Sequence, residues 1–334
     1  MNRARRIARL FALFSYKKKG MKKERKLEIL GKILILSATI VWGSSFVVLK
    51  DALDKFGNGH FTFLILALRF IVATVIIFFC VIRKLKTINR SIALKGIILG
   101  VILFLAYAVQ TLGLKYTTPS KNSFLTVTYC VLVPFLSWLV LKQKPKLSHY
   151  IAGGLCLLGI AFVAILGKNE SAGNTEWIGD ILSAACGLFY ALQIVYISKY
   201  AATEDGTVLL FFEILTVGVL CSIVTCSCEI PLHYSEISFD FEIIWKILYL
   251  AVFATCFAQF AQMFAQKYVA PLSVALILSL EGVFGVIFEL ISGAKVMSVY
   301  IWIGFALILA SQIIGEIDPI TALKEKFNKN KNNS

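Results

Sequence analysis

Residues 107–119 read YAVQTLGLKYTTP, and residues 259–271 read QFAQMFAQKYVAP. The two stretches share a glutamine, a Lys-Tyr pair and a proline at an offset of 152 residues. Weaker matches pair residues 148–157 with 298–307 and residues 35–38 with 181–184, in the same order and at nearly the same offset. The chain therefore contains an internal duplication. In an apolar chain, such a duplication is typical of transporters whose halves surround one central site.

The composition is that of an integral membrane protein. Hydrophobic residues make up 58% of the 334 residues and charged residues 16%, against roughly 45–50% and about 25% in soluble domains. Apolar runs near the ~20 residues needed for a membrane helix recur along the chain, and they are too long for barrel strands. We predict an all-α fold with ten transmembrane helices, at 33–49, 61–82, 96–114, 120–141, 149–166, 178–198, 207–226, 244–265, 271–292 and 298–315.

The ten spans divide into two repeats of five helices, residues 33–166 and 177–316, joined by an external linker at 167–176. Because five is an odd number, the second repeat enters the membrane from the opposite side, and the repeats are predicted to be inverted. Inverted halves favour alternating access, since exchanging their conformations converts an inward-open state into an outward-open one.

The distribution of positive charge gives the orientation. The formal net charge is +15, from 34 lysine and arginine residues and 19 acidic ones. With the amino terminus placed inside, 26 of these basic residues lie in inner segments, 7 in outer segments and one, Arg69, within the membrane. This asymmetry predicts a cell-membrane protein with both termini in the cytoplasm. The basic tails, 1–32 and 317–334, are expected to contact anionic lipids. A nucleic-acid partner is disfavoured, because no aromatic-interleaved basic fold is present.

The first tail is ambiguous. Met21 is a second plausible start, so residues 1–20 are either an upstream extension or a genuine part of the chain. No small-residue cleavage site of a signal peptide follows the short apolar run at 10–14. In either case we expect a disordered or interfacial tail.

Several other function classes are disfavoured by missing motifs. The eight cysteines have no metal-ligand spacing, and the three histidines lie in different segments. No HExxH, GxSxG or GxxxxGK[ST] motif is present, which argues against an enzyme and against direct ATP coupling. Short loops and the lack of a soluble domain argue against a sensor or scaffold. No catalytic residue, metal or cofactor is predicted.

A set of short motifs resembles a known family. Trp42-Gly43-Ser44-Ser45-Phe46, Leu68-Arg69-Phe70, Lys115-Tyr116-Thr117-Thr118-Pro119, Leu132-Val133-Pro134 and Leu280-Glu281-Gly282-Val283 occur in this order. Together with the two five-helix repeats, they resemble the EamA-type branch of the drug/metabolite transporter superfamily over residues 30–316. The resemblance implies a ten-helix bundle, no prosthetic group and export or exchange of small metabolites, often amino acids. The chain departs from the family pattern at Gly282, where proline is common, and at residues 142–144 and 294–295, where Gly-Glu is common.

Charged residues within spans are costly and often functional. The repeat alignment sets Arg69 opposite Glu213, which predicts an intramembrane ion pair that serves as a strut, a gate or a carboxylate clamp. Glu281 lies in the middle of the ninth span. Burial away from a cation disfavours the charged carboxylate, so Glu281 is either a proton-coupling residue or a permanently neutral hydrogen-bonded group.

Polar side chains at helical spacing form stripes on several spans, and those on the third and eighth spans are equivalent in the two repeats. Such stripes either form interhelical hydrogen bonds or line a central cavity. The cavity candidates, including one arginine and one tryptophan near mid-span, are Trp42, Ser45, Arg69, Tyr107, Gln110, Asn122, Thr126, Tyr129, Tyr190, Gln193, Gln259 and Gln262. Pro134, inside the fourth span, is the candidate hinge.

The sequence as a whole predicts a secondary transporter that exports small metabolites, amino acids or related compounds, by alternating access. A broad-specificity drug or cation exporter is the alternative, and a nucleotide-sugar carrier a more distant one. The small-molecule substrate is not identified by the sequence. Ten helices can enclose a cavity without a partner, so a monomer and a homodimer are both compatible.

Overall fold

The computed structural model describes residues 2–162, 176–293 and 299–317, and the elements in these ranges are helical without a strand. The helices of the first half are α1 (Asn2–Lys55), α2 (Thr62–Val81), α3 (Arg90–Tyr116), α4 (Pro119–Thr126), α5 (Tyr129–Leu141) and α6 (Leu147–Ala161). Those of the second half are α7 (Glu176–Ala201), α8 (Gly206–Val224), α9 (Ile230–His233), α10 (Phe241–Ala251), α11 (Ala258–Tyr268), α12 (Pro271–Leu278), α13 (Leu280–Ile291) and α14 (Val299–Ile317).

Eight helical segments of the described chain are long and apolar enough to cross a bilayer. They are Lys23–Gly59, Thr62–Lys84, Arg90–Tyr116, Pro119–Leu141, Glu176–Ala201, Gly206–Glu236, Phe241–Tyr268 and Pro271–Ile291. The other two predicted spans, 149–166 and 298–315, correspond to shorter apolar helices, Leu147–Ala161 and Trp302–Gly315. The chain is thus a multi-pass membrane protein with eight helices of sufficient length among the described residues; the predicted spans 149–166 and 298–315 run beyond those residues and stay predictions.

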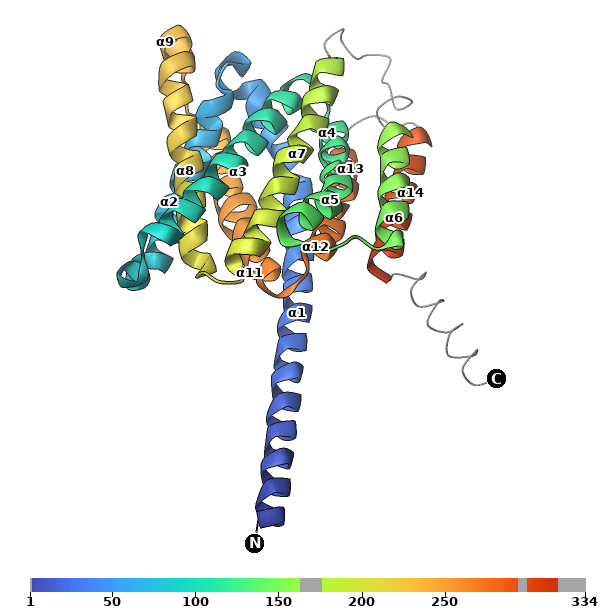
Figure 1. Cartoon of the computed structure of the whole chain (residues 1–334). Helices are drawn as coiled ribbons and strands as arrows, with labels where there is room; N and C mark the ends of the chain where they lie inside the picture. The colour runs from blue at the N-terminus through green and yellow to red at the C-terminus, as the bar shows by residue number, and fades with distance from the viewer. Residues whose placement is uncertain (1, 163–175, 294–298, 318–334) are drawn as a thin grey trace.

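The amino-terminal segment is helical. Helix α1 begins at Asn2 and continues into the first span, so of the two predicted states, disordered or interfacial, the helix is compatible with the interfacial one, which stays a prediction. Figure 1 shows this part of α1 projecting well beyond the bundle. The predicted external linker before Glu176 and the carboxy-terminal tail after Ile317 lie outside the described residues.

Two spans are broken at equivalent positions of the two repeats. Helices α4 and α5 are separated at Val127–Thr128, and α12 and α13 at Ser279. At the first break the amide of Val127 bonds to the carbonyl of Phe124 (3.2 Å), one residue closer than in an α-helix. At the second, the hydroxyl of Ser279 donates to the carbonyl of Leu276 (2.8 Å). Hydroxyl side chains compete for backbone carbonyls in this way, which weakens regular helix at both breaks.

Pro134, the predicted hinge, does not coincide with the break in its span, and the hinge stays a prediction. Helix α5 runs without interruption through Pro134, which is buried in it. A proline removes only one backbone donor, and a bundle tolerates this loss. The interruption lies seven residues earlier, at Val127–Thr128.

Helices of the two halves pack directly on one another (Figure 1). Helix α2 packs against α8, α3 against α7 and α8, α1 against α11 and α13, and α4 against α13. Helices α6 and α14, which occupy equivalent places in the two repeats, pair at the periphery. The halves therefore form one bundle, and any space at its centre is lined from both.

The contact between α3 and α7 depends on two facing glycines. A Cβ added to Gly113 would lie 3.0 Å from the backbone nitrogen of Ser183 and 3.1 Å from the carbonyl of Gly179. A Cβ added to Gly179 would lie 2.8 Å from the carbonyl of Gly113. Backbone atoms cannot rotate away as a side chain does, so small residues here allow the two helices to approach closely.

We expect Gly113→Ala to lower stability, because the added methyl group must push α3 and α7 apart at a cost of about 1–3 kcal/mol. An unobstructed glycine-to-alanine change in a helix gains roughly 0.5–1 kcal/mol instead. The matched control is Gly154→Ala in α6, where the added Cβ meets nothing within 4 Å. Apparent melting temperatures in detergent should fall for Gly113→Ala and be kept or raised for Gly154→Ala. Equal shifts would contradict the tight contact.

Candidate functional site

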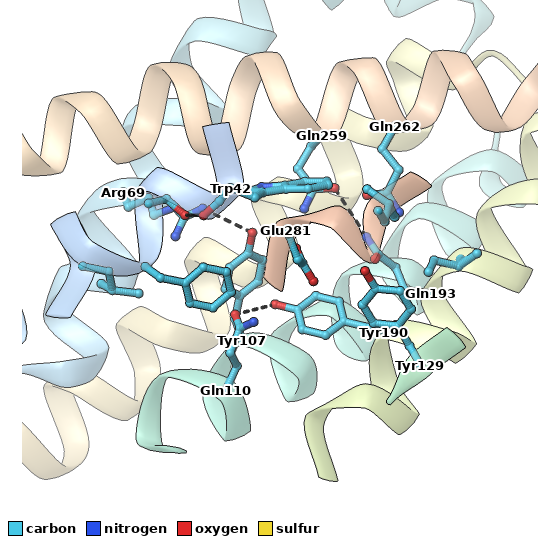
Figure 2. A pocket seen from close by; sticks show the side chains of 15 residues that line it. Trp42, Arg69, Tyr107, Gln110, Tyr129, Tyr190, Gln193, Gln259, Gln262 and Glu281 are labelled. Carbon is cyan, nitrogen blue, oxygen red and sulfur yellow. Dashed lines mark hydrogen bonds between the residues drawn. The ribbon is translucent and has the colours of Figure 1, made fainter. Parts of the chain in front are cut away.

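A pocket lies where the two halves meet (Figure 2). Its walls come from α1, α2, α3, α5, α7, α11, α12 and α13. The lining residues are Trp42, Ser45, Phe46, Leu49, Arg69, Tyr107, Gln110, Tyr129, Tyr190, Gln193, Ile194, Gln259, Gln262, Leu278 and Glu281. Its free volume is about 40 Å³, room for roughly three water molecules.

Arg69 is held by an irregular stretch of the opposite half. Between α10 and α11 the chain forms a π-helix, η6 (Val252–Phe257). The Nε of Arg69 donates to the hydroxyl of Thr255 (2.5 Å), and its Nη2 donates to the carbonyl of Ala254 (3.1 Å) and the hydroxyl of Tyr107 (3.2 Å). A π-helix leaves carbonyls without their usual α-helical partners, and one of these receives the guanidinium.

The predicted ion pair between Arg69 and Glu213 is not formed in the structure. Arg69 is 1% exposed and Glu213 is fully buried, but neither contacts the other within ion-pair distance. Glu213 accepts a hydrogen bond from Nε2 of Gln193 (2.9 Å), and its second carboxyl oxygen has no partner among the described residues. Repeat equivalence placed the two residues on facing helices, but the π-helix supplied acceptors that Arg69 uses instead.

The charge of Arg69 is balanced by dipoles and aromatic rings. Its guanidinium carbon lies 4.8 Å from the ring centre of Tyr107 and 5.4 Å from that of Phe70, within the range of cation–π attraction. No carboxylate of the described chain pairs with it. Its Nη1 group, with two N–H donors, makes no hydrogen bond to the described residues. Arg69 therefore retains the two N–H donors of Nη1 for an anionic group.

Trp42 donates to the same backbone carbonyl as Arg69, that of Ala254. Its Nε1 donates to the carbonyl of Ala254 at 2.9 Å, across 212 residues of sequence. The indole ring thus forms a wall of the pocket and is fixed by the same π-helix that holds Arg69. One irregular turn in the second half orients two functional candidates of the first half.

Glu281 lies on the opposite part of the wall, in the first turn of α13 next to the helix break at Ser279. Figure 2 shows its carboxyl group directed into the midst of the labelled side chains, near Tyr129 and Tyr190. It forms no ion pair with a described residue. Its neighbour in hydrogen-bonding range is the hydroxyl of Tyr129, the residue at the equivalent position of the first repeat.

The glutamine stripes converge on the pocket. Gln110 accepts a hydrogen bond from the hydroxyl of Tyr190 (2.7 Å), and Gln193 donates to Gln259 (3.4 Å). Gln262 lines the pocket and makes no hydrogen bond to a described residue. Both predicted stripes, on α3 and α11, therefore reach the central space.

Two of the cavity candidates lie behind the wall. Asn122 donates to the backbone carbonyl of Gln110 (3.1 Å) and to the hydroxyl of Ser183 (2.6 Å). Thr126 accepts from the side-chain amide of Gln110 (3.2 Å). These two residues contact Gln110 and are not among the residues that line the space.

The sequence analysis missed four apolar lining residues, Phe46, Leu49, Ile194 and Leu278. Apolar residues give no signal against the background of a membrane helix. Two of them could have been identified from their neighbours, since Phe46 directly follows Ser45 and Ile194 directly follows Gln193, which were both candidates.

Comparisons with known proteins agree with this architecture. The EamA-like transporter family matches residues 29–165 and 177–314. An uncharacterized transporter of Archaeoglobus fulgidus is 32% identical over 275 residues, covering 82% of each chain. Solute carrier family 35 member F2 of Mus musculus is 31% identical over 152 residues, 42% of this chain and 38% of the mouse protein. These names are those of transporters, not enzymes.

The fold also has a counterpart among solved structures. A crystal structure superimposes with a TM-score of 0.66 over 85% of this chain and 95% of the other, at 15% identity, which supports the fold alone. The family match covers both repeats and most of the chain. The protein therefore belongs to the EamA-like transporter family and is a multi-pass membrane transporter.

Proposed function

We propose that the protein is a secondary transporter that exports small metabolites bearing both a carboxylate and an amino group, amino acids or related compounds. The observation that carries this proposal is the pairing of opposite charges in one pocket. Arg69 offers unpartnered N–H donors to a carboxylate, and Glu281 offers a carboxyl group to an ammonium. Between them, the side-chain amides of Gln110 and Gln262 supply neutral hydrogen-bonding groups.

Alternating access is the mechanism that the packing supports best. The pocket has room for about three water molecules, so an amino acid enters only when the surrounding helices move apart. Both broken spans reach the pocket beside their breaks, through Tyr129 in α5 and through Leu278 and Glu281 in α12 and α13. Discontinuous helices at the midplane are where many transporters bind their substrates and gate access.

The proposal includes ten spans in two inverted repeats, with both termini in the cytoplasm. It places the shorter helices α6 and α14 across the membrane as a peripheral pair, each packed against its equivalent. The inner excess of positive charge supports this orientation. The basic tails then face the anionic leaflet.

A broad-specificity cation exporter is the second candidate, and the aromatic walls favour it. Trp42, Tyr129 and Tyr190 line the pocket beside Glu281, and aromatic faces with one carboxylate suit organic cations. Arg69 opposes it, because a fixed positive charge in the same pocket repels a cation that lacks a carboxylate.

The test is untargeted mass spectrometry of medium and cytosol from cells producing the wild-type protein or the Arg69→Ala, Glu281→Ala double variant. We expect a zwitterionic metabolite to accumulate in the medium only with the wild type. Membrane insertion of both proteins is the control. Accumulation of organic cations lacking a carboxylate would favour the second candidate, and identical media would contradict metabolite export.

A further inference from the structure

A cluster of metal-binding side chains lies at one end of the bundle, outside the central pocket. It consists of His60, in the turn between α1 and α2, with His233 of α9 and Glu236 of the following turn, η5 (Tyr234–Glu236). Their ligand atoms all lie within 4.8 Å of one another. Figure 1 places the top of α1 and α9 at the end of the bundle away from the amino terminus.

The distances within the cluster suit the chelation of one ion. One carboxylate oxygen of Glu236 lies 2.8 Å from Nδ1 of His60, and the other lies 3.1 Å from Nδ1 of His233. The two imidazole rings stack with centres 3.9 Å apart and planes 4° from parallel. Ligand atoms around a tetrahedral zinc ion are separated by roughly 3.4 Å, since Zn–N and Zn–O bonds are about 2.0–2.2 Å. The three donors are therefore close enough to surround one ion once the stacked rings rotate so that both Nδ1 lone pairs point at it.

The surroundings hold the donors in place. Glu229, one turn before His233, accepts hydrogen bonds from the backbone amides of Phe63 (2.7 Å) and Leu64 (2.8 Å), at the start of α2. The side-chain amide of Asn58 also donates to Glu236 (3.3 Å). These contacts fix the α1–α2 turn against α9. Supporting hydrogen bonds of this kind orient ligands and tune metal sites.

We propose that His60, His233 and Glu236 form a Zn²⁺-binding site that links the two halves of the transporter. Two imidazole nitrogens and one carboxylate oxygen are the donor set of many three-ligand zinc sites, with a fourth position left to water. In the metal-bound form each neutral imidazole carries its proton on Nε2 and presents Nδ1 to the ion. The side chains are partly exposed, with 42%, 30% and 28% of each accessible, so solution metal can reach them.

The position of the site gives it a consequence for transport. His60 belongs to the first family repeat, and His233 and Glu236 belong to the second. A bound ion therefore restrains the halves from separating at this end. This consequence rests on the proposed alternating-access function, whereas metal binding itself does not.

The first experiment measures binding without transport. Full-length protein is purified in detergent, stripped of metal, alkylated at its cysteines and titrated with Zn²⁺ in competition with a zinc indicator. We expect the wild type to bind one Zn²⁺ ion. The Zn²⁺ affinity should fall by on the order of 10–100-fold in Glu236→Gln, and it should fall further in His60→Asn. His149→Asn, which changes the third histidine of the chain, is the matched control and should keep the wild-type affinity.

Folding of each variant is checked by its melting temperature in the absence of metal. Zn²⁺ should raise the melting temperature of the wild type and of His149→Asn, but not that of His60→Asn. Equal Zn²⁺ affinity in the wild type and in well-folded His60→Asn and Glu236→Gln proteins overturns the site.

A second experiment tests the link between the halves. In proteoliposomes, Zn²⁺ added to the side of the cluster should slow wild-type transport of the identified compound, Mg²⁺ should not, and His60→Asn should be insensitive. Uninhibited transport by a zinc-loaded wild type overturns the link but not the site. A wild type that transports nothing even without Zn²⁺, but still binds the ion, would instead count against the proposed function and leave the site intact.

Discussion

Replacing Arg69 with glutamine is expected to weaken substrate binding by roughly 30- to 4,000-fold. The reason is that truncating one partner of a buried, hydrogen-bonded charge pair costs about 2–5 kcal/mol, and each 1.4 kcal/mol is tenfold. Arg69→Lys keeps the charge but loses the forked donors and the bond from Nε to Thr255. It should therefore retain only part of the activity. Concentration dependence of uptake into proteoliposomes, using the compound found by mass spectrometry, measures both.

Glu213→Gln is the matched control for this prediction. Glu213 is as deeply buried as Arg69, but its partner is Gln193, whose amide donates to it. A glutamine at position 213 presents a carbonyl oxygen to the same donor, so binding should change only a few-fold. If Arg69 and Glu213 instead formed the ion pair expected from the repeat alignment, Glu213→Gln would leave a buried cation unpaired and be as damaging as Arg69→Gln. If both variants lost substrate binding equally, and if exchanging the two residues recovered it, the Arg69–Glu213 ion pair would be supported after all.

The second large effect is expected at Glu281. We predict that Glu281→Gln abolishes transport driven by a proton gradient while substrate exchange without a gradient continues. Glu281 is 7% exposed and has no cationic partner among the described residues. A glutamine keeps the shape of the side chain but cannot take up or release a proton. Proteoliposomes with an imposed pH difference, compared with liposomes loaded with substrate on both sides, separate coupling from binding.

Tyr129→Phe is the control for Glu281, because Tyr129 occupies the equivalent position of the first repeat and also lines the pocket. It removes a polar group near Glu281 without removing the titratable carboxyl. Gradient-driven transport should persist in this variant. Unchanged dependence on pH in Glu281→Gln would show that the carboxyl is a permanently neutral structural group and would sink the coupling hypothesis.

Comparing the two repeats indicated which helical faces border the pocket, but it did not indicate which side chains bond to one another. Four residues of the stripes on the third and eighth spans lie in the pocket wall: Tyr107, Gln110, Gln259 and Gln262. Side chains on one helical face share an orientation, and the repeat implies that both halves border the same space. Asn122 and Thr126 do not line the pocket and instead form hydrogen bonds with Gln110 behind its wall. A polar stripe on one helix does not reveal which of its members a neighbouring helix covers.

The sequence by itself determined the membrane class, the duplication and the eight long spans. Each of these depends on local composition or on self-similarity, since a helix crosses a bilayer when enough consecutive residues are apolar. Only the tertiary structure decided the partners of Arg69, the location of the breaks and the meeting of His60 with His233. Partner choice depends on how each helix is rotated and where its backbone departs from regular geometry, as at Val252–Phe257. Those departures are settled by packing between segments that are far apart in the chain, as with Trp42 and Ala254, and no local pattern encodes them.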